Sequence, residues 1–193
     1  MKWLNIWHNW LIGKKEATQS VKSVIMPRLE PQISAHNKRH SSAKVRFGTL
    51  ADVNLFIELE KQGYDGYLAW ERHDFKKDLK QNPYAVYLLL EVENQVIAMI
   101  SGRFTHKTAH ISHLIVRPHY QRQGFGRMLL VLWIQLAQSQ GVAQVSLEVR
   151  SDNHSAKHLY QQQGFETTVE VPDYYIDGSS ALQMRLPLLT KRE

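Results

Sequence analysis

A strand-like run, a short loop with two glycines and an amphipathic helix follow one another between Ala109 and Gln140. Pro118 ends the strand-like run 109–116, because proline cannot donate to a strand ladder. In the helix, apolar side chains recur at the i, i+3, i+4, i+7 spacing of a helix that buries one face, and Gly141 closes it. These positions are Phe125, Met128, Leu129, Leu132, Trp133, Leu136 and Ala137. A strong helix set directly between strand-like runs predicts an α/β fold.

Hydrophobic periodicity and turn residues place the other elements. Expected strands cover residues 45–50, 84–92, 96–104, 143–149, 166–171 and 181–186, and expected helices cover residues 52–62, 70–80 and 155–163. Asn94–Gln95 is expected to turn a hairpin. The order is strand, two helices, three strands, helix, strand, helix and two strands. We interpret residues 45–193 as one α/β domain with a mixed, mostly antiparallel central sheet flanked by helices.

Residues 1–44 form a basic leader that differs from the rest of the chain in charge. They carry eight of the 24 basic residues and two of the 18 acidic ones, so the +6 charge resides here and residues 45–193 carry sixteen of each sign. From Trp3 to Leu11, Trp and aliphatic residues fall on one arc at about 100° per residue. This predicts a short amphipathic Trp-rich helix followed by a linker. Docking on the protein's own body, on a partner protein or on a membrane surface stays open for this helix.

The composition excludes several classes of protein. The chain has no Cys, which excludes disulfides, Cys-ligated zinc and a cysteine nucleophile. It has no run of about 18 apolar residues and therefore no expected spanning helix. The neutral body argues against direct nucleic-acid binding by the core. The absence of Cys fits a reducing cytosol, and we expect a cytoplasmic protein.

The loop before the strongest helix combines glycine with positive charge. Gly124 and Gly126 stand at the helix start, where backbone N–H groups have no intrahelical partners and favour anions. Arg122 and Arg127 add positive charge. The loop lacks the Lys-Ser/Thr of a P-loop and the third Gly of the dinucleotide fingerprint, which disfavours a nucleoside triphosphate or NAD. From these residues alone, the loop can be interpreted either as a phosphate-binding loop or as a tight turn without a ligand.

Glu148 stands inside a strand-like run between two apolar neighbours. Strand alternation puts it on one face with Ser146 and Arg150. A carboxylate there costs free energy unless it is paired or functional, so an ion pair with Arg150 or with a neighbouring strand is the simpler alternative. Twelve residues later, Tyr160 lies on the next expected helix, where a packing role is the simpler interpretation.

Together these segments resemble the GNAT superfamily of acetyl-CoA-dependent N-acyltransferases. The run Gln121-x-x-Gly124-x-Gly126 is similar to the superfamily's pyrophosphate-binding motif. Residues 147–165 resemble the pattern LEVR-x-x-N-x-x-A-x-x-LY-x-x-x-GF of the RimI-type ribosomal-protein alanine N-acetyltransferases. Residues 120–130 and the pair Tyr174–Tyr175 are similar to that branch as well. The resemblance covers about residues 45–187 and leaves the leader out.

The resemblance implies a GNAT-like fold and a role for particular residues. Acetyl-CoA would be held by the strand end Leu114, Ile115 and Val116, by the loop residues Arg122, Gln123, Gly124, Phe125, Gly126 and Arg127, and by Asn153. Glu148 matches the family's general base and Tyr160 its general acid. Trp70, Tyr174 and Tyr175 would border the acceptor peptide.

The implied chemistry is consistent with these residue types. An amine attacks only when neutral, and the pKa of a protein α-amine is about 7.7–8.0, against about 10.4 for lysine. A weak base such as Glu148 therefore suffices near neutral pH. The Val116 N–H is the expected donor to the oxyanion, and Tyr160 can give a proton to the leaving thiolate. The substrate amine is the nucleophile, so we expect no metal. His110 and His113 are expected on opposite faces of their strand, which argues against a shared metal site.

We therefore expect acetyl transfer to an N-terminal α-amine, and the resemblance implies the N-terminal alanine of a small-subunit ribosomal protein. Four acidic residues near the expected groove are compatible with a basic peptide: Glu58, Glu60, Asp65 and Glu71. An acetyltransferase for a small-molecule amine and a non-catalytic acetyl-CoA-binding module are the alternatives.

Overall fold

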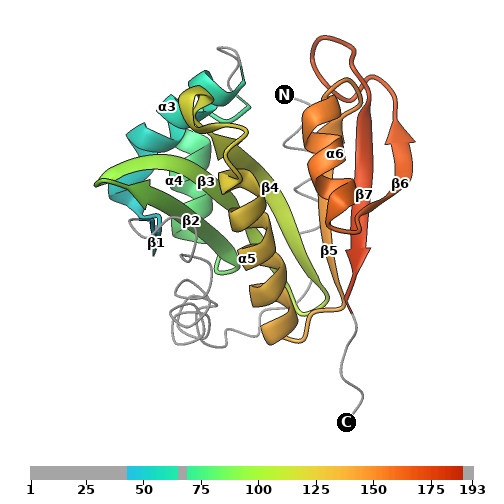
Figure 1. The fold of residues 1–193 in the computed structure, drawn as a ribbon, viewed down its shortest axis with the longest axis horizontal. Coiled ribbons are helices and arrows are strands. Elements are labelled where there is room, and N and C mark those ends of the chain that lie inside the picture. Colours follow the sequence, from blue (N-terminus) through green and yellow to red (C-terminus); the bar gives the residue numbers. More distant parts are fainter. Residues whose placement is uncertain (1–42, 65–68, 189–193) are drawn as a thin grey trace.

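The strands form one sheet in the order β1-β2-β3-β4-β5-β7-β6 (Figure 1). The computed structural model describes residues 43–64 and 69–188. The strands are β1 (Lys44–Phe47), β2 (Ala85–Val92), β3 (Gln95–Phe104), β4 (Thr108–Val116), β5 (Gln144–Arg150), β6 (Glu166–Val171) and β7 (Ala181–Pro187). The helices are α3 (Val53–Gly63), α4 (Arg72–Gln81), α5 (Phe125–Ser139) and α6 (His154–Gln162), with short 3₁₀ turns at Leu50–Asp52 and Pro118–Tyr120. Only β4 and β5 pair in parallel among the described strands, so the predicted mixed, mostly antiparallel sheet is confirmed.

Helices cover both faces of the sheet, in two layers that differ in composition. On the near face in Figure 1, α5 and α6 pack on the larger core, which contains Trp133 and Leu147. On the other face, α3 and α4 pack on a smaller core around Phe56, Phe75 and Tyr87. Because β2 lies between these layers, its first six residues are all buried. This explains why β2 is almost continuously apolar in sequence rather than alternating.

The hairpin between β2 and β3 turns at Glu93 and Asn94, one residue before the predicted pair. Both residues have positive φ, 52° and 63°. Two successive residues in this region form the type of two-residue turn whose twist matches that of the strands it joins. Asn tolerates this conformation better than most side chains, which is the physical basis of the turn signal in the sequence.

A β-bulge in β4 overturns the expectation that His110 and His113 point to opposite faces. Ser101 pairs with His113, whereas the next residue of β3, Gly102, pairs with Ile111. Ser112 is therefore an extra residue in β4, and the alternation of side chains reverses beyond it. Accordingly Ile111 packs in the α5 core, while His113 and His110 both lie on the α3–α4 face.

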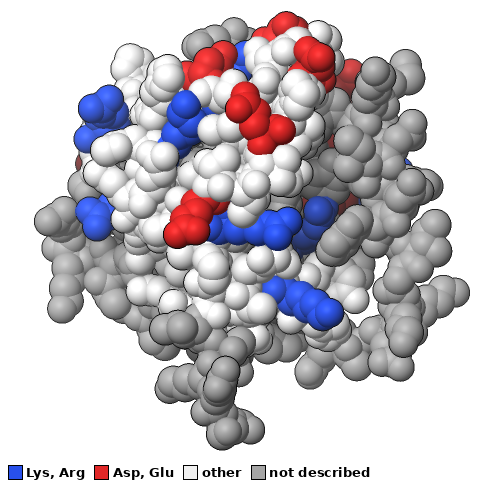
Figure 2. Space-filling model, turned by 90° about the vertical axis from the view of Figure 1, so that its right-hand side faces the viewer, with Lys and Arg blue, Asp and Glu red and all other residues white. Residues whose placement is uncertain are grey.

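Every element predicted within the described residues is present, and no end differs from the prediction by more than three residues. The predicted Trp-rich helix of the leader lies outside the described residues. None of the helices in the described ranges is long and apolar enough to cross a membrane. On the face that carries α6, β6 and β7, basic and acidic side chains are interspersed (Figure 2).

Candidate active site

The two parallel strands at the centre of the sheet pair over only part of their length. β4 and β5 pair from Thr108–Gln144 to Ile111–Leu147. Beyond Ile111, β4 runs on to Val116 without β5 beside it, and the two strands part toward the top of Figure 1. Sheet hydrogen bonding is therefore interrupted in the middle of the molecule, where a buried backbone normally has partners.

The strand end predicted to hold the cofactor lies along this parting. The Arg117 N–H donates to the Ile97 carbonyl at 2.8 Å, on the β3 side. Because backbone groups alternate in direction along a strand, the N–H and C=O of Val116 point away from β3. The Val116 carbonyl accepts from Gln121 Nε2 at 3.0 Å. The predicted residues Leu114–Val116 thus border the parting with an edge that β5 does not cover.

The start of α5 faces open space. Gly124 is the N-cap residue with φ +90°, and no heavy atom of the described residues lies within 4 Å of the position a Cβ would take. Within the part of the chain that the structure describes, no side chain caps the first turn, so its N–H groups keep their capacity for an anion. Arg122 and Arg127 are exposed beside it. Phe125, however, is 3% exposed and packs in the core, so only its backbone is available to a ligand.

Asn153, also predicted to touch the cofactor, caps α6. Its Oδ1 accepts from the Ala156 N–H at 3.0 Å. The sequence motif that contains Asn153 therefore has a local structural role in starting a helix. The amide group of Asn153 is exposed.

Glu148 lines a hollow of about 250 Å³ on the face opposite α5 and α6. It does not pair with Arg150, which bonds Asp152 at 3.1 Å and Asp177 at 2.9 Å instead. Burial raises the pKa of Glu148, and the positive charges of Arg103 and Arg185 oppose that rise. A carboxyl with a raised pKa in a hollow is a candidate for general-base chemistry.

Glu148 lies beside His110, whose Nε2 is 3.3 Å from Glu148 Oε2. His110 Nδ1 lies 2.9 Å from the Ser146 hydroxyl oxygen. Burial lowers the pKa of His110 to about 3, helped by Arg103 and His113, so the ring is neutral near pH 7. In the tautomer with hydrogen on Nε2, the Ser146 hydroxyl donates to Nδ1, and the N–H group is on the ring nitrogen nearer to Glu148. His110 is a buried hydrogen-bonding residue next to the candidate base.

Tyr160 approaches from the other side of the sheet. It lies on α6, 7% exposed, with its ring 5.7 Å from that of Phe165. It belongs to the same core as Leu147, so Tyr160 and Glu148 lie on opposite faces of β5. Burial raises the pKa of Tyr160, which keeps the hydroxyl protonated and able to donate.

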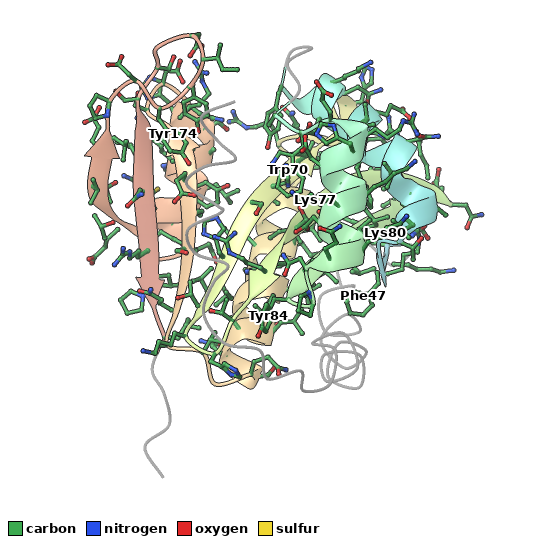
Figure 3. All side chains as sticks on the ribbon, turned by 180° about the vertical axis from the view of Figure 1, so that it is seen from behind. Phe47, Trp70, Lys77, Lys80, Tyr84 and Tyr174 are labelled. Carbon is green, nitrogen blue, oxygen red and sulfur yellow. The ribbon has the colours of Figure 1, made fainter. Side chains whose placement is uncertain are left out.

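Of the three predicted substrate residues, Tyr174 is the one that lines the hollow, and Figure 3 shows Trp70 on the side of α4. Tyr174, after β6, lines the hollow together with Glu148 and stacks edge-on with Tyr175 at 5.2 Å. The Arg150 guanidinium lies 4.8 Å from the centre of the Tyr175 ring. Trp70, before α4, makes an edge contact with His113 at 5.0 Å.

A second buried polar cluster was not anticipated from the sequence. Glu60 is fully buried, and its Oε2 accepts from the Trp70 N–H at 3.1 Å. His113 Nε2 lies 2.9 Å from Glu60 Oε1 without its N–H being aimed at that oxygen, and His113 Nδ1 lies 2.8 Å from the Ser101 hydroxyl. Only the β4 bulge brings His113 to this face. The cluster joins the end of α3 to the segment that carries Trp70.

This cluster corrects the idea of an acidic groove for a basic peptide. Glu60 is not on the surface, and Glu58 pairs with Arg117 at 2.7 Å. Glu71 is exposed at the start of α4, and Asp65 lies outside the described residues. The residues that line the hollow itself include two arginines, Arg103 and Arg185, which the sequence interpretation did not single out.

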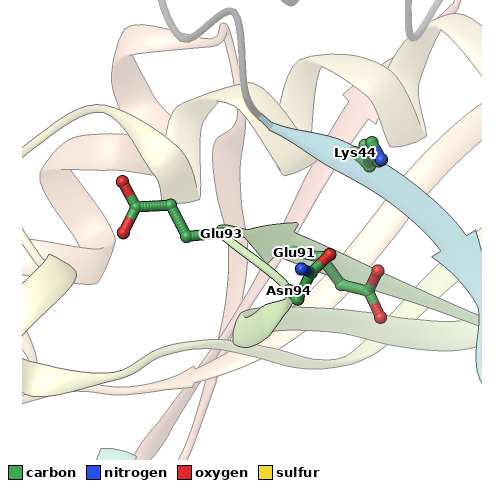
Figure 4. Close-up of a pocket in the computed structure, with 4 residues that line it drawn as sticks. All are labelled: Lys44, Glu91, Glu93 and Asn94. Atoms are coloured by element: carbon green, nitrogen blue, oxygen red, sulfur yellow. The ribbon is translucent and has the colours of Figure 1, made fainter.

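Another hollow, of about 170 Å³, lies at the β2–β3 turn (Figure 4). Its lining residues are Lys44, Glu91, Glu93 and Asn94. It is on the β1 edge of the sheet, remote from the parting of β4 and β5. In the described part of the chain, no group of three or more His, Asp or Glu side chains is placed to hold a metal ion.

Comparison with known proteins gives three kinds of match. Residues 53–165 match the model of the Acetyltransferase (GNAT) family. A Bacillus subtilis (strain 168) protein, provisionally named a [ribosomal protein bS18]-alanine N-acetyltransferase, is 30% identical over 145 residues, which are 75% of this chain and 95% of that protein. The crystal structure of the ribosomal-protein-S18-alanine N-acetyltransferase from Escherichia coli superposes with a TM-score of 0.71 at 27% identity, covering 78% of this chain and 97% of that one.

The same fold also occurs in an enzyme named for a different acceptor. A spermidine/spermine N-acetyltransferase from Vibrio cholerae superposes with a TM-score of 0.65 at 16% identity, covering 77% of this chain and 95% of that one. At this identity the likeness concerns the fold alone, so the acceptor has to be argued from side chains.

Proposed function

The chain belongs to the GNAT family of acetyl-CoA-dependent N-acetyltransferases, and from that premise we propose that it acetylates the α-amine of a protein N-terminus. The first candidate substrate is the N-terminal alanine of ribosomal protein bS18, the substrate in the names of the two similar proteins. We place this reaction in the cytoplasm. The observation that carries the proposal is the parting of β4 and β5, with Glu148 as the first β5 residue beyond the paired segment.

The residues along the parting suit acetyl-CoA. The backbone edge of Leu114–Val116 offers hydrogen bonds to an extended amide-containing arm. The uncapped first turn of α5, with Arg122 and Arg127, suits the pyrophosphate. Gly124 leaves the space next to that turn open. When bound, acetyl-CoA contributes an acetyl group activated as a thioester.

Glu148 is the proposed general base. It takes a proton from the incoming ammonium, directly or through water, so that the neutral amine can attack. Its raised pKa makes it a better proton acceptor than an ordinary carboxylate, and the charges of Arg103 and Arg185 limit that rise. His110 lies beside the carboxylate and, as a neutral ring, adds no charge to the site.

Two donors complete the proposed site. The Val116 N–H points into the parting and is placed to stabilise negative charge on the acetyl oxygen. Tyr160, on the opposite face from Glu148, keeps its proton and is the proposed acid for the departing sulfur. Trp70, Tyr174 and Tyr175 are the proposed borders of the acceptor site.

Mass spectrometry of peptide acetylation tests this function. Peptides with ribosomal-protein N-termini are incubated with acetyl-CoA and wild type, Glu148→Gln or Tyr160→Phe. We expect wild type to acetylate the α-amine of the peptide, and we expect kcat to be lower by about 100-fold or more in each variant. Glu170→Gln, an exposed change on β6, and Tyr84→Phe, at the residue just before β2 (labelled in Figure 3), are matched controls that should retain kcat.

Three outcomes would contradict parts of the proposal. Wild-type kcat in both active-site variants would remove the catalytic assignment. Acetylation of free polyamines but of no peptide would replace the acceptor by a small amine. Calorimetry that detects no binding of acetyl-CoA would remove the central claim.

A further inference from the structure

Four polar side chains form a row straight across the middle of the sheet. Arg103 on β3 pairs with His110 on β4, His110 with Ser146 on β5, and Ser146 with Arg185 on β7. Directly paired residues point to the same face of a sheet. With neighbouring strands about 4.8 Å apart, the two arginines start roughly 14 Å from one another, at the two ends of the row. Both line the hollow, as do His110 and Ser146.

This row lies directly beside the candidate base. On β5, Glu148 follows Ser146 by two residues on the same face, about 6.6 Å along the strand. Glu148 pairs across β7 with Gln183, which lines the same hollow. Whatever amine reaches Glu148 therefore has the rest of its molecule within reach of the row.

The row has an excess of positive charge. The His110 ring is neutral, and Ser146 is its hydrogen-bond partner. Of the charged groups lining the hollow, Arg103 and Arg185 are positive and Glu148 is negative. Proton transfer from the ammonium to Glu148 neutralises both of these groups, so the net charge in the hollow is the same before and after the transfer. Both arginines line the hollow at each stage, and an anionic group on the acceptor would be attracted to them.

We propose that the Arg103–His110–Ser146–Arg185 row is a subsite for a carboxylate of the acceptor, so that the enzyme prefers N-termini with Asp or Glu as the second residue. This inference rests on the proposed function. Arginine binds carboxylates through two parallel N–H···O bonds, which gives direction as well as charge. Consecutive Cα atoms are 3.8 Å apart, so a side chain on the second residue spans the distance from Glu148 to the row. A lysine as the second residue would be disfavoured, because its positive charge would be repelled by the two arginines.

Three peptides that differ only at the second residue test the subsite: Ala-Glu, Ala-Gln and Ala-Lys at the N-terminus of an otherwise identical sequence. With wild type, we expect KM to be lowest for Ala-Glu, about tenfold below Ala-Gln, because one charge-assisted bond is worth about that factor. In Arg103→Gln and in Arg185→Gln, KM for Ala-Glu should rise to the Ala-Gln value, so that each variant no longer distinguishes the two peptides by KM. Arg185→Glu should reverse the order in favour of Ala-Lys, which no loss of folding can do.

Arg103→Lys and Lys80→Gln serve as controls. The first keeps a charge at the half-buried position and should retain part of the preference for Ala-Glu. The second removes an exposed charge on α4 and should leave all three KM values unchanged. Equal KM values for the three peptides in wild type would overturn the subsite while leaving α-amine acetylation intact.

If no peptide is acetylated, the proposed function fails. The carboxylate subsite is then tested with free aspartate and free glutamate as acceptors, because each carries an α-amine and a side-chain carboxylate. Acetylation of these amino acids that is lost in Arg185→Gln would retain the subsite for a small acceptor. No acetylation of either would overturn it.

Discussion

The surroundings of Glu148 have opposing effects on the pKa of its carboxyl group. Burial raises its pKa, two arginines lower it, and a neutral imidazole lies 3.3 Å away. Each neighbour comes from a different strand: Arg103 from β3, His110 from β4 and Arg185 from β7. The strength of the proposed base is therefore set by residues far apart in sequence, and a single substitution should change it in a known direction.

Arg103→Gln should shift the acidic limb of the kcat–pH profile to higher pH. The variant removes a positive charge that lowers the pKa of Glu148, so the carboxyl stays protonated, and inactive as a base, to a higher pH. The profile is measured with the Ala-Gln peptide, whose second residue has no charge of its own. Lys80→Gln is the charge control. An unshifted limb in Arg103→Gln would mean that Glu148 is not the group whose ionisation limits kcat.

At the scale of the element, the β3–β4 bulge determines which face two histidines occupy. Ser112 is the extra residue, and beyond it His113 comes to the same face as His110. The bulge also brings the two backbones unusually close. A Cβ on Gly102 would lie 1.9 Å from the His110 carbonyl oxygen. Glycine is required at position 102 because the atoms that a side chain would meet belong to the β4 backbone, which cannot move aside as a flexible side chain can.

Gly102→Ala should lower the free energy of unfolding by about 2–3 kcal/mol, since the methyl group can be accommodated only by moving a strand at the centre of the sheet. Chemical denaturation followed by tryptophan fluorescence measures this. Acetylation by the folded fraction should fall too, because His110 carries the displaced carbonyl. An unfolding free energy equal to that of wild type would show that the register at the bulge is different.

Gly126→Ala, in the first turn of α5, is the comparison for Gly102→Ala. Here we expect no loss of stability. Its Cβ would lie 3.5 Å from Val116 and 3.7 Å from Leu159, which are ordinary contacts. Alanine also favours a helix over glycine, so stability should be retained or rise by up to about 1 kcal/mol. If the first turn holds the pyrophosphate, KM for acetyl-CoA should nevertheless rise about tenfold or more, since the methyl group occupies the approach to the backbone. An unchanged KM for acetyl-CoA would mean that the pyrophosphate does not bind at the first turn of α5.

At the scale of the whole molecule, the described residues contain two hydrophobic cores, one on each face of the sheet. Ala43 is fully buried and β1 begins at Lys44, so the sheet starts just before the predicted boundary at Val45. Arg46 on β1 ties this edge to Glu91 at 2.6 Å and to Asp52 at 2.8 Å. These contacts lie within residues 43–188. We propose that residues 1–42 serve association with a partner or a membrane surface rather than catalysis.

A chain that begins at Ala43 should therefore unfold at the same temperature as the full chain and retain its kcat on peptides. What it should lose is association, which is measured by co-sedimentation with ribosomes and with anionic lipid vesicles. Loss of kcat would instead place the leader in the catalytic domain. Unchanged association in both assays would remove the proposed role.

Local sequence was sufficient for the elements and for the residues that share one segment. Periodicity predicted α5 and the strands, and the glycine–arginine loop and the Glu148–Tyr160 motif could be recognised because their residues are close in sequence. Gly124 has the positive φ that a loop at a helix start requires, and that requirement is local.

Tertiary structure alone decided which distant side chains meet. The row from Arg103 to Arg185 depends on the register of four strands, and the Glu60–His113 contact depends on a bulge one residue long. A shift of one residue turns every side chain of a strand to the other face. Such registers are fixed by packing on both faces of the sheet, through contacts between residues distant in sequence, and for that reason the surroundings of Glu148 could not be predicted from its own segment.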